Sequence, residues 1–87
     1  MQPANLHDLL LVTAFRHRIK ESDAEEGRLK IARLTGREIE AGAFRAALSA
    51  LLADGLIYDP VNLPPGALQC HWRLELTPDG FERARSL

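Results

Sequence analysis

Cysteine and aromatic residues are scarce in this 87-residue chain, which has one cysteine, Cys70, and 6% Phe, Trp and Tyr. A single cysteine excludes an internal disulfide and any metal site built only from cysteines. It also fits a reducing compartment. So few aromatic side chains argue against a surface on which single-stranded nucleic acid would stack.

Long hydrophobic runs are also missing, since no stretch reaches the roughly 18 apolar residues that span a membrane. The first residues, from Met1 to Asn5, carry neither the basic flank nor the cleavage site of a signal peptide. We therefore expect a cytoplasmic protein with no membrane partner, made of one domain over residues 1–87.

The sequence offers little for catalysis or metal binding. It has no glycine-rich phosphate loop and no local set of nucleophile, base and acid. Cys70 and His71 are adjacent, and no second pair stands at the spacing that zinc ligands prefer. We expect no catalytic residues, no metal and no cofactor, and hence no enzyme.

Positive charge is not in surplus, because 11 Lys and Arg stand against 12 Asp and Glu, for a net charge of −1. Nucleic-acid-binding domains usually carry a positive surplus. The average composition therefore argues against strong DNA binding, and only an uneven distribution of charge supports it. Basic residues do outnumber acidic ones in the segment from Arg28 to Arg45.

The N-terminal segment has the apolar spacing of a mostly buried helix. Asn5 is a favourable N-cap, and Asp8 suits the positive end of the helix. Basic residues crowd the end of this segment, as a helix C-terminus favours, so we predict a helix that extends to Lys20. Its apolar positions are Leu6, Leu9, Leu10, Leu11, Val12, Ala14, Phe15 and Ile19.

An acidic loop at 21–26 precedes the second predicted helix, with Ser22 and Asp23 as candidate caps. The glycine of Thr35–Gly36 is the usual end of a helix. Thr35 also has an alternative interpretation, as the N-cap of the third helix with Glu38 completing a capping box.

A third helix is predicted from Arg37 to Asp54, with Gly55 ending it and Gly42 as a weak point near its start. Apolar residues repeat along it at the spacing of a core-facing side. These residues are Phe44, Ala47, Leu48, Leu51 and Leu52.

The C-terminal third predicts an antiparallel hairpin and a closing helix. A short strand at Leu56–Tyr58 is followed by a turn-rich loop at 59–66 and by strict alternation over Leu68–Thr77. Thr77 then serves as N-cap, with Pro78 at the first helical position. The inward side chains of the second strand are Cys70, Trp72 and Leu74.

Three motifs carry a resemblance to a known fold. They are IARLTG at 31–36, ALSALLADGLI at 47–57 and WRLELTPDGFERA at 72–84. Together they resemble the second helix, the end of the recognition helix and the return strand of the winged helix-turn-helix, as in MarR-like and PadR-like transcriptional regulators. The resemblance implies a mainly α-helical fold with a small antiparallel β-hairpin, and a regulator that binds double-stranded DNA as a homodimer.

The resemblance and the charge pattern together select the candidate DNA contacts. The third helix would enter the major groove, with basic side chains on phosphates and two outward residues near base edges. The candidates are Arg28, Lys30, Arg33, Arg37, Arg45 and Ser49. The sequence departs from the family where Glu40 to Ala43 replace hydroxyl and basic side chains, and where no Lys or Arg lies between Ile57 and Trp72.

The alternative hypothesis is a winged-helix module that binds protein and does not read DNA. Its candidate partner-binding residues form the apolar hairpin tip, at Leu63, Pro64 and Pro65. The same tip is alternatively folded back on its own domain, and a homodimer interface would come from either the first helix or the tip.

Overall fold

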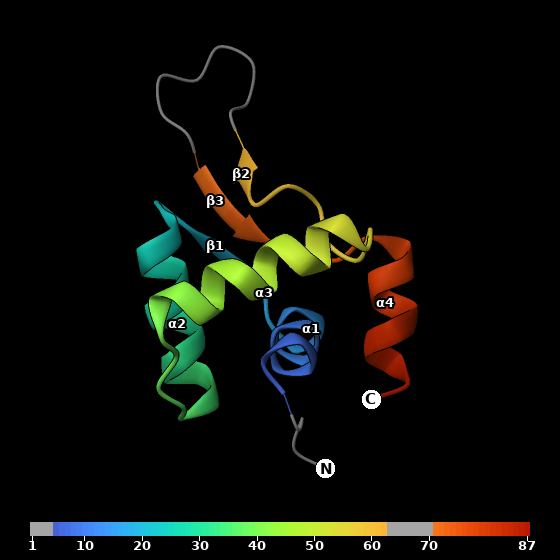
Figure 1. Ribbon diagram of the computed structural model, residues 1–87, viewed down its shortest axis with the longest axis horizontal. Helices are drawn as coiled ribbons and strands as arrows, with labels where there is room; N and C mark the ends of the chain where they lie inside the picture. The colour runs from blue at the N-terminus through green and yellow to red at the C-terminus, as the bar shows by residue number, and fades with distance from the viewer. Residues whose placement is uncertain (1–4, 63–70) are drawn as a thin grey trace.

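The structure is a computed structural model, and it describes residues 5–62 and 71–87. The elements follow in the order α1 (Leu6–Arg16), β1 (Ile19–Glu21), α2 (Ala24–Thr35), α3 (Ala41–Ala53), β2 (Val61–Asn62), β3 (His71–Leu74) and α4 (Pro78–Arg85). Figure 1 shows the helices of the described residues arranged around a small sheet. The predicted class, mainly helical with a small antiparallel sheet, is confirmed.

The sheet has the strand order β1-β3-β2, and both strand pairs are antiparallel. Ile19 pairs with Leu74 and Lys20 with Arg73, whereas Val61 of β2 lies opposite Trp72. The central strand β3 therefore pairs on one side with β2, the strand that comes before it in the chain, and on the other side with the N-terminal strand β1, which was not predicted from the sequence.

The N-terminal helix is shorter than predicted. Its start is confirmed, since the Asn5 side chain accepts a hydrogen bond from the Asp8 backbone N–H at 2.8 Å. Its extension to Lys20 is wrong, because α1 ends at Arg16 and His17 is already extended. The helical spacing of Ile19 misled the prediction, since a three-residue strand is too short to establish its own periodicity.

The second helix begins at Ala24, within the acidic loop that was predicted at 21–26. Asp23 is its N-cap and accepts from the Glu26 backbone N–H at 2.9 Å, so the predicted cap is confirmed. Gly36 adopts the left-handed conformation after the last turn, with φ 68°. Thr35 lies inside α2 and donates to the Ile31 carbonyl, so the capping-box interpretation is wrong.

The third helix begins at Ala41, and the predicted start at Arg37 is wrong. Four members of its predicted core face are buried, namely Phe44, Ala47, Leu48 and Leu51. The fifth, Leu52, has 40% of its surface exposed, so its assignment to the core is wrong. Leu52 lies at the edge of the apolar face, where the neighbouring elements no longer cover it.

The predicted hairpin is antiparallel, as expected, but its first strand is not where the sequence placed it. The strand predicted at Leu56–Tyr58 is reduced to one bridge between Ile57 and Leu76, and β2 falls inside the predicted loop. Thr77 caps α4 by accepting from the Gly80 backbone N–H at 3.1 Å, and Pro78 follows it, as predicted. Cys70 and the predicted partner-binding tip at Leu63, Pro64 and Pro65 lie outside the described residues.

The core lies between the helices and the inner face of the sheet. Trp72 points inward from β3 and meets Phe44 of α3 with a ring-centroid distance of 5.9 Å. Gly27 lets α2 approach closely, because a Cβ at this position would overlap the Trp72 ring. The strands alternate, so Lys20 and Arg73 on the opposite face of the sheet remain outside this core.

Candidate nucleic-acid interface

The outward side of α3 is the surface on which the predicted DNA contacts would lie. In Figure 1, α3 crosses the front of the molecule, with α2 on one side and α4 on the other. Arg45 and Ser49 are both exposed, and they lie one helical turn apart, so their side chains are neighbours. These two of the six predicted residues share one surface.

Arg28 is held within the protein. One of its terminal nitrogens donates to the Ile39 carbonyl at 2.6 Å, and the other forms an ion pair with Glu25. Only 19% of its side chain is exposed. Arg28 therefore ties α2 to the segment that leads into α3, and this contact competes with any contact to a phosphate.

Glu40 makes the start of α3 locally acidic. Its two carboxylate oxygens accept from the backbone N–H groups of Gly42 and Ala43, at 2.7 and 2.8 Å. These hydrogen bonds, and after them the charges of Arg45 and Arg28, lower the pKa of Glu40 below its ordinary value. The carboxylate therefore stays ionised beside the arginine that faces outward from α3.

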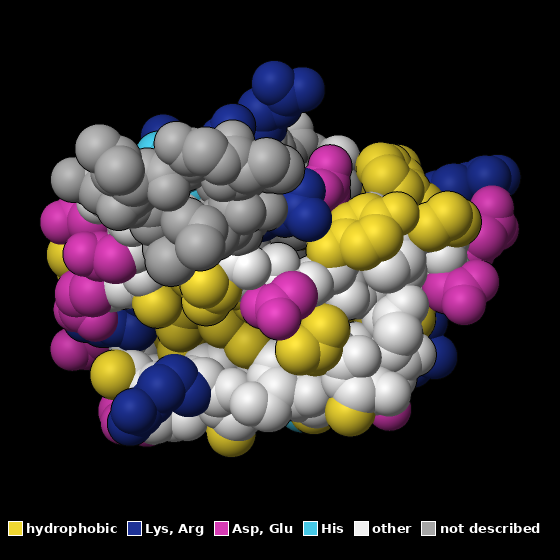
Figure 2. Space-filling view, turned by 90° about the horizontal axis from the view of Figure 1, so that it is seen from above, with side chains coloured by type: hydrophobic (Ala, Val, Ile, Leu, Met, Phe, Trp, Pro, Cys, Tyr) yellow, Lys and Arg dark blue, Asp and Glu magenta, His cyan; other side chains and the backbone are white. Residues whose placement is uncertain are grey.

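The other predicted cations lie on α2 and directly after its C-terminus. Lys30 is half-buried and Arg33 is exposed, both on α2. Arg37 lines a hollow of about 200 Å³ together with Arg16 and His17 of the α1 C-terminus. Seen from above, Lys and Arg side chains are visible at the upper edge, at the right edge, at the lower left and near the centre of the view (Figure 2).

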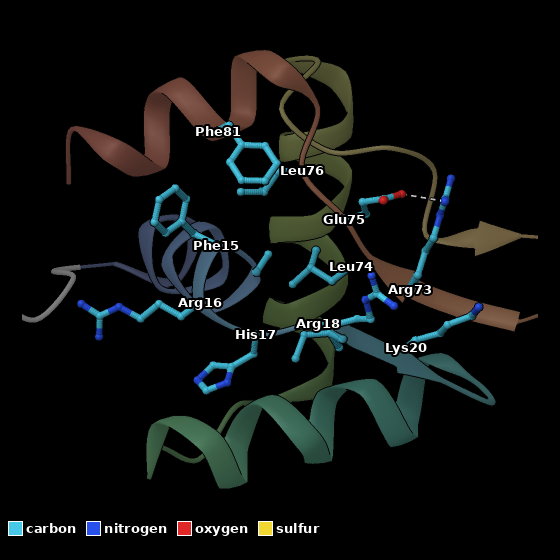
Figure 3. A pocket seen from close by; sticks show the side chains of 12 residues that line it. Phe15, Arg16, His17, Arg18, Lys20, Arg73, Leu74, Glu75, Leu76 and Phe81 are labelled. Carbon is cyan, nitrogen blue, oxygen red and sulfur yellow. Dashed lines mark ion pairs between the residues drawn. The ribbon is translucent and has the colours of Figure 1, made fainter.

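A second cationic surface lies on the outer face of the sheet. Lys20 and Arg73 stand opposite each other there, and Arg18 lines the same hollow of about 390 Å³. We call this hollow the sheet-face groove, and Figure 3 shows the side chains that line it. The sequence analysis missed it because β1 was assigned to a helix, although the polar–apolar–polar order from Arg18 to Lys20 has the period of a strand.

The described part of the chain has neither a cluster of metal ligands nor a membrane-spanning helix. Within residues 5–62 and 71–87, His, Cys, Asp and Glu side chains do not come together in threes as a metal would require. Over the same ranges, the helices are too short or too polar to cross a bilayer.

Comparison of the chain with protein-family models, with curated proteins and with solved structures finds no match.

Proposed function

We propose that this protein is a winged-helix protein that binds double-stranded DNA and regulates transcription, with α3 in the major groove. The order α1-β1-α2-α3-β2-β3-α4 supports the proposal, because a helical pair followed by a β-hairpin is the arrangement of that fold. Gly36 ends α2 in the left-handed conformation, which turns the chain toward α3 as a helix-turn-helix requires.

The observation that carries the proposal is the exposed pair of Arg45 and Ser49 on the outward side of α3. A guanidinium forms paired hydrogen bonds with guanine or with a phosphate, and a hydroxyl accepts or donates at any base edge. Arg45 has no ion-pair partner among the described residues, so its charge is available to the duplex. Arg33 adds a second exposed cation on the adjacent helix α2.

Glu40 and Arg28 limit the affinity for DNA that we expect. A carboxylate at the start of α3 repels phosphates, and Arg28 already has a carboxylate partner. The proposed complex is therefore dominated by a few phosphate contacts, and its affinity falls steeply with salt.

The test measures the binding of a mixed-sequence duplex by fluorescence anisotropy at about 50 and 200 mM salt, where log affinity should fall by about 0.9 per phosphate contacted. We expect Arg45→Ala to weaken binding and to reduce this slope by about one contact. Arg83→Ala is the matched control, because Arg83 is an exposed cation on α4. Absence of binding at low salt, or equal effects of both variants, would overturn the proposal.

A second candidate function, binding of a protein partner or a second copy, is favoured by the alanine-rich exposed side of α3. Ala43 and Ala46 are exposed there. Such a helix face allows a partner to approach closely. Ala46→Arg separates the two functions, because it adds a cation that should strengthen DNA binding but obstructs a protein contact. Light scattering of both proteins measures the number of copies.

A further inference from the structure

The sheet-face groove has two chemically different ends. At one end, Phe15 of α1 and Phe81 of α4 meet edge to face, with ring centroids 5.7 Å apart. At the other end lie Arg18, Lys20 and Arg73, as Figure 3 shows. Arg16 and His17 also line the groove, but their side chains point away from its centre in this view.

The cationic end is charged beyond what the protein itself compensates. Lys20 and Arg73 stand directly opposite each other on adjacent strands, and like charges in such pairs are destabilising. Among the described residues that line the groove, Glu75 is the only acidic one, and it pairs with Arg73 at 2.6 Å. Among the described residues, Arg18 and Lys20 have no ion-pair partner.

Arg73 has a fixed position and an unused donor. Its guanidinium carbon lies 5.5 Å from the centroid of the Tyr58 ring, and Glu75 holds one terminal nitrogen. Its Nε is buried without a hydrogen-bond partner in the described part of the chain. This atom is closed to solvent, so a ligand in the groove would meet the terminal guanidinium nitrogens of Arg73.

The apolar end leaves two rings open to solvent. Phe15 is 42% exposed and Phe81 is 47% exposed, although the two rings touch each other across α1 and α4. Aromatic side chains are usually among the most buried in a small domain, and an exposed pair offers a surface for a flat ring. The groove volume of about 390 Å³ suits one small ligand.

From this arrangement we infer that the sheet-face groove binds a nucleotide, with its base against Phe15 and Phe81 and its phosphates on Arg18, Lys20 and Arg73. An aromatic monocarboxylate would leave most of the positive charge uncompensated, whereas a nucleoside diphosphate carries several negative charges. An inorganic polyphosphate would make no use of the two rings. A nucleotide satisfies both ends at once.

A free nucleotide fits better than a nucleic-acid strand. The hollow has room for one ligand, and the ring pair forms only one end of it. A strand would need a continuous row of stacking side chains beside a basic track. The inference does not rest on DNA binding, because no residue of α3 lines the groove.

Isothermal titration with ADP, adenosine, pyrophosphate and benzoate tests the inference in the absence of metal ions. We expect saturable 1:1 binding of ADP, and binding of the other three weaker by about tenfold or more, since base stacking and phosphate contact each contribute. Adenosine, pyrophosphate or benzoate binding as tightly as ADP would overturn the inference. So would the absence of ADP binding up to about 5 mM, or tighter binding of an oligoadenylate strand.

Single substitutions test which end of the groove binds the base and which end binds the phosphates. Phe81→Ala should weaken ADP binding by about tenfold and leave pyrophosphate binding unchanged, because it removes half of the ring pair. Lys20→Gln should weaken both ligands, whereas the control Lys30→Gln, which changes a cation outside the groove, should alter neither. Circular dichroism checks that each variant is folded. Equal effects of Lys20→Gln and Lys30→Gln would show that only the net charge matters and would sink the assignment.

Discussion

At the scale of single residues, Glu40 links the stability of α3 to its proposed role. Its carboxylate satisfies two of the backbone N–H groups that a helix start leaves unpaired. The same carboxylate places negative charge where a duplex would approach. The residue therefore stabilises the fold at the expense of the function that we propose for α3.

Glu40→Gln should lower the thermal midpoint at pH 7 and remove part of the acid sensitivity of the protein. Because the folded-state pKa of Glu40 is depressed, its stabilisation is present above the ordinary pKa of about 4.5 and is lost as the pH falls through the depressed value. The difference in thermal midpoint between wild type and variant should therefore shrink steadily below about pH 4.5. Thermal unfolding followed by circular dichroism from pH 3 to 7 measures it.

Glu38→Gln is the matched control, because Glu38 is exposed and takes part in no hydrogen bond among the described residues. The same Glu40→Gln protein should bind duplex DNA more tightly, since repulsion at the start of α3 is removed. A difference in midpoint that does not change with pH would show that the charge of Glu40 is not what stabilises the helix.

Helix N-caps could be predicted from the sequence where the residue is Asn, Asp or Thr, which are common at that position. Asn5, Asp23 and Thr77 each accept a hydrogen bond from a backbone N–H three residues later, as predicted. Glu40 was not predictable, because glutamate is an unusual N-cap. Its role depends on the extended backbone of the segment before α3.

At the scale of elements, α3 has one side in the core and another side in solvent. Leu48→Ala should lower the free energy of unfolding by about 2–5 kcal/mol, since it opens a cavity in the core. Leu52→Ala, on the same helix but at an exposed position, should change it by less than about 0.5 kcal/mol. Urea denaturation of both variants tests the orientation of α3, and equal losses would contradict it.

In the sheet, Lys20 is unfavourable for stability but favourable for binding of the inferred ligand. Lys20→Glu should raise the free energy of unfolding by about 0.2–1 kcal/mol, because it turns a like-charged cross-strand pair into an opposite one. The same change should abolish ADP binding. Urea denaturation and calorimetry of one variant measure both effects, and a loss of stability would contradict the register of Lys20 and Arg73.

At the scale of the whole molecule, the two proposed binding surfaces are separate. Figure 3 shows α3 running behind the side chains that line the sheet-face groove, and the groove contains no α3 residue. The cations of the chain are therefore divided between surfaces, which explains how a net charge of −1 is compatible with local positive regions.

Saturating ADP should change the affinity for duplex DNA by less than about twofold, because sites without shared residues act nearly independently. At about 150 mM salt, screening over roughly 8 Å limits the effect of the bound phosphates on a distant duplex. Anisotropy titrations with and without ADP measure this. Mutual competition would place the duplex on the sheet face and would remove the role assigned to Arg45.

The sequence by itself determined the local features of this protein: the starts of α1 and α4, the cap and the glycine end of α2, the buried side of α3 and the direction of the hairpin. Each of these features depends on side chains within a few residues of one another, so it can be inferred from the order of residues alone. Only the tertiary structure decided that Ile19–Glu21 is a strand, because its partner β3 lies about fifty residues away. The same long-range pairing brings Arg18 and Lys20 beside Arg73. Packing of α2 against the segment before α3 gives Arg28 a hydrogen-bond partner in the Ile39 carbonyl. Which basic side chains remain without a partner therefore depends on contacts between distant residues, and the order of residues could not show it.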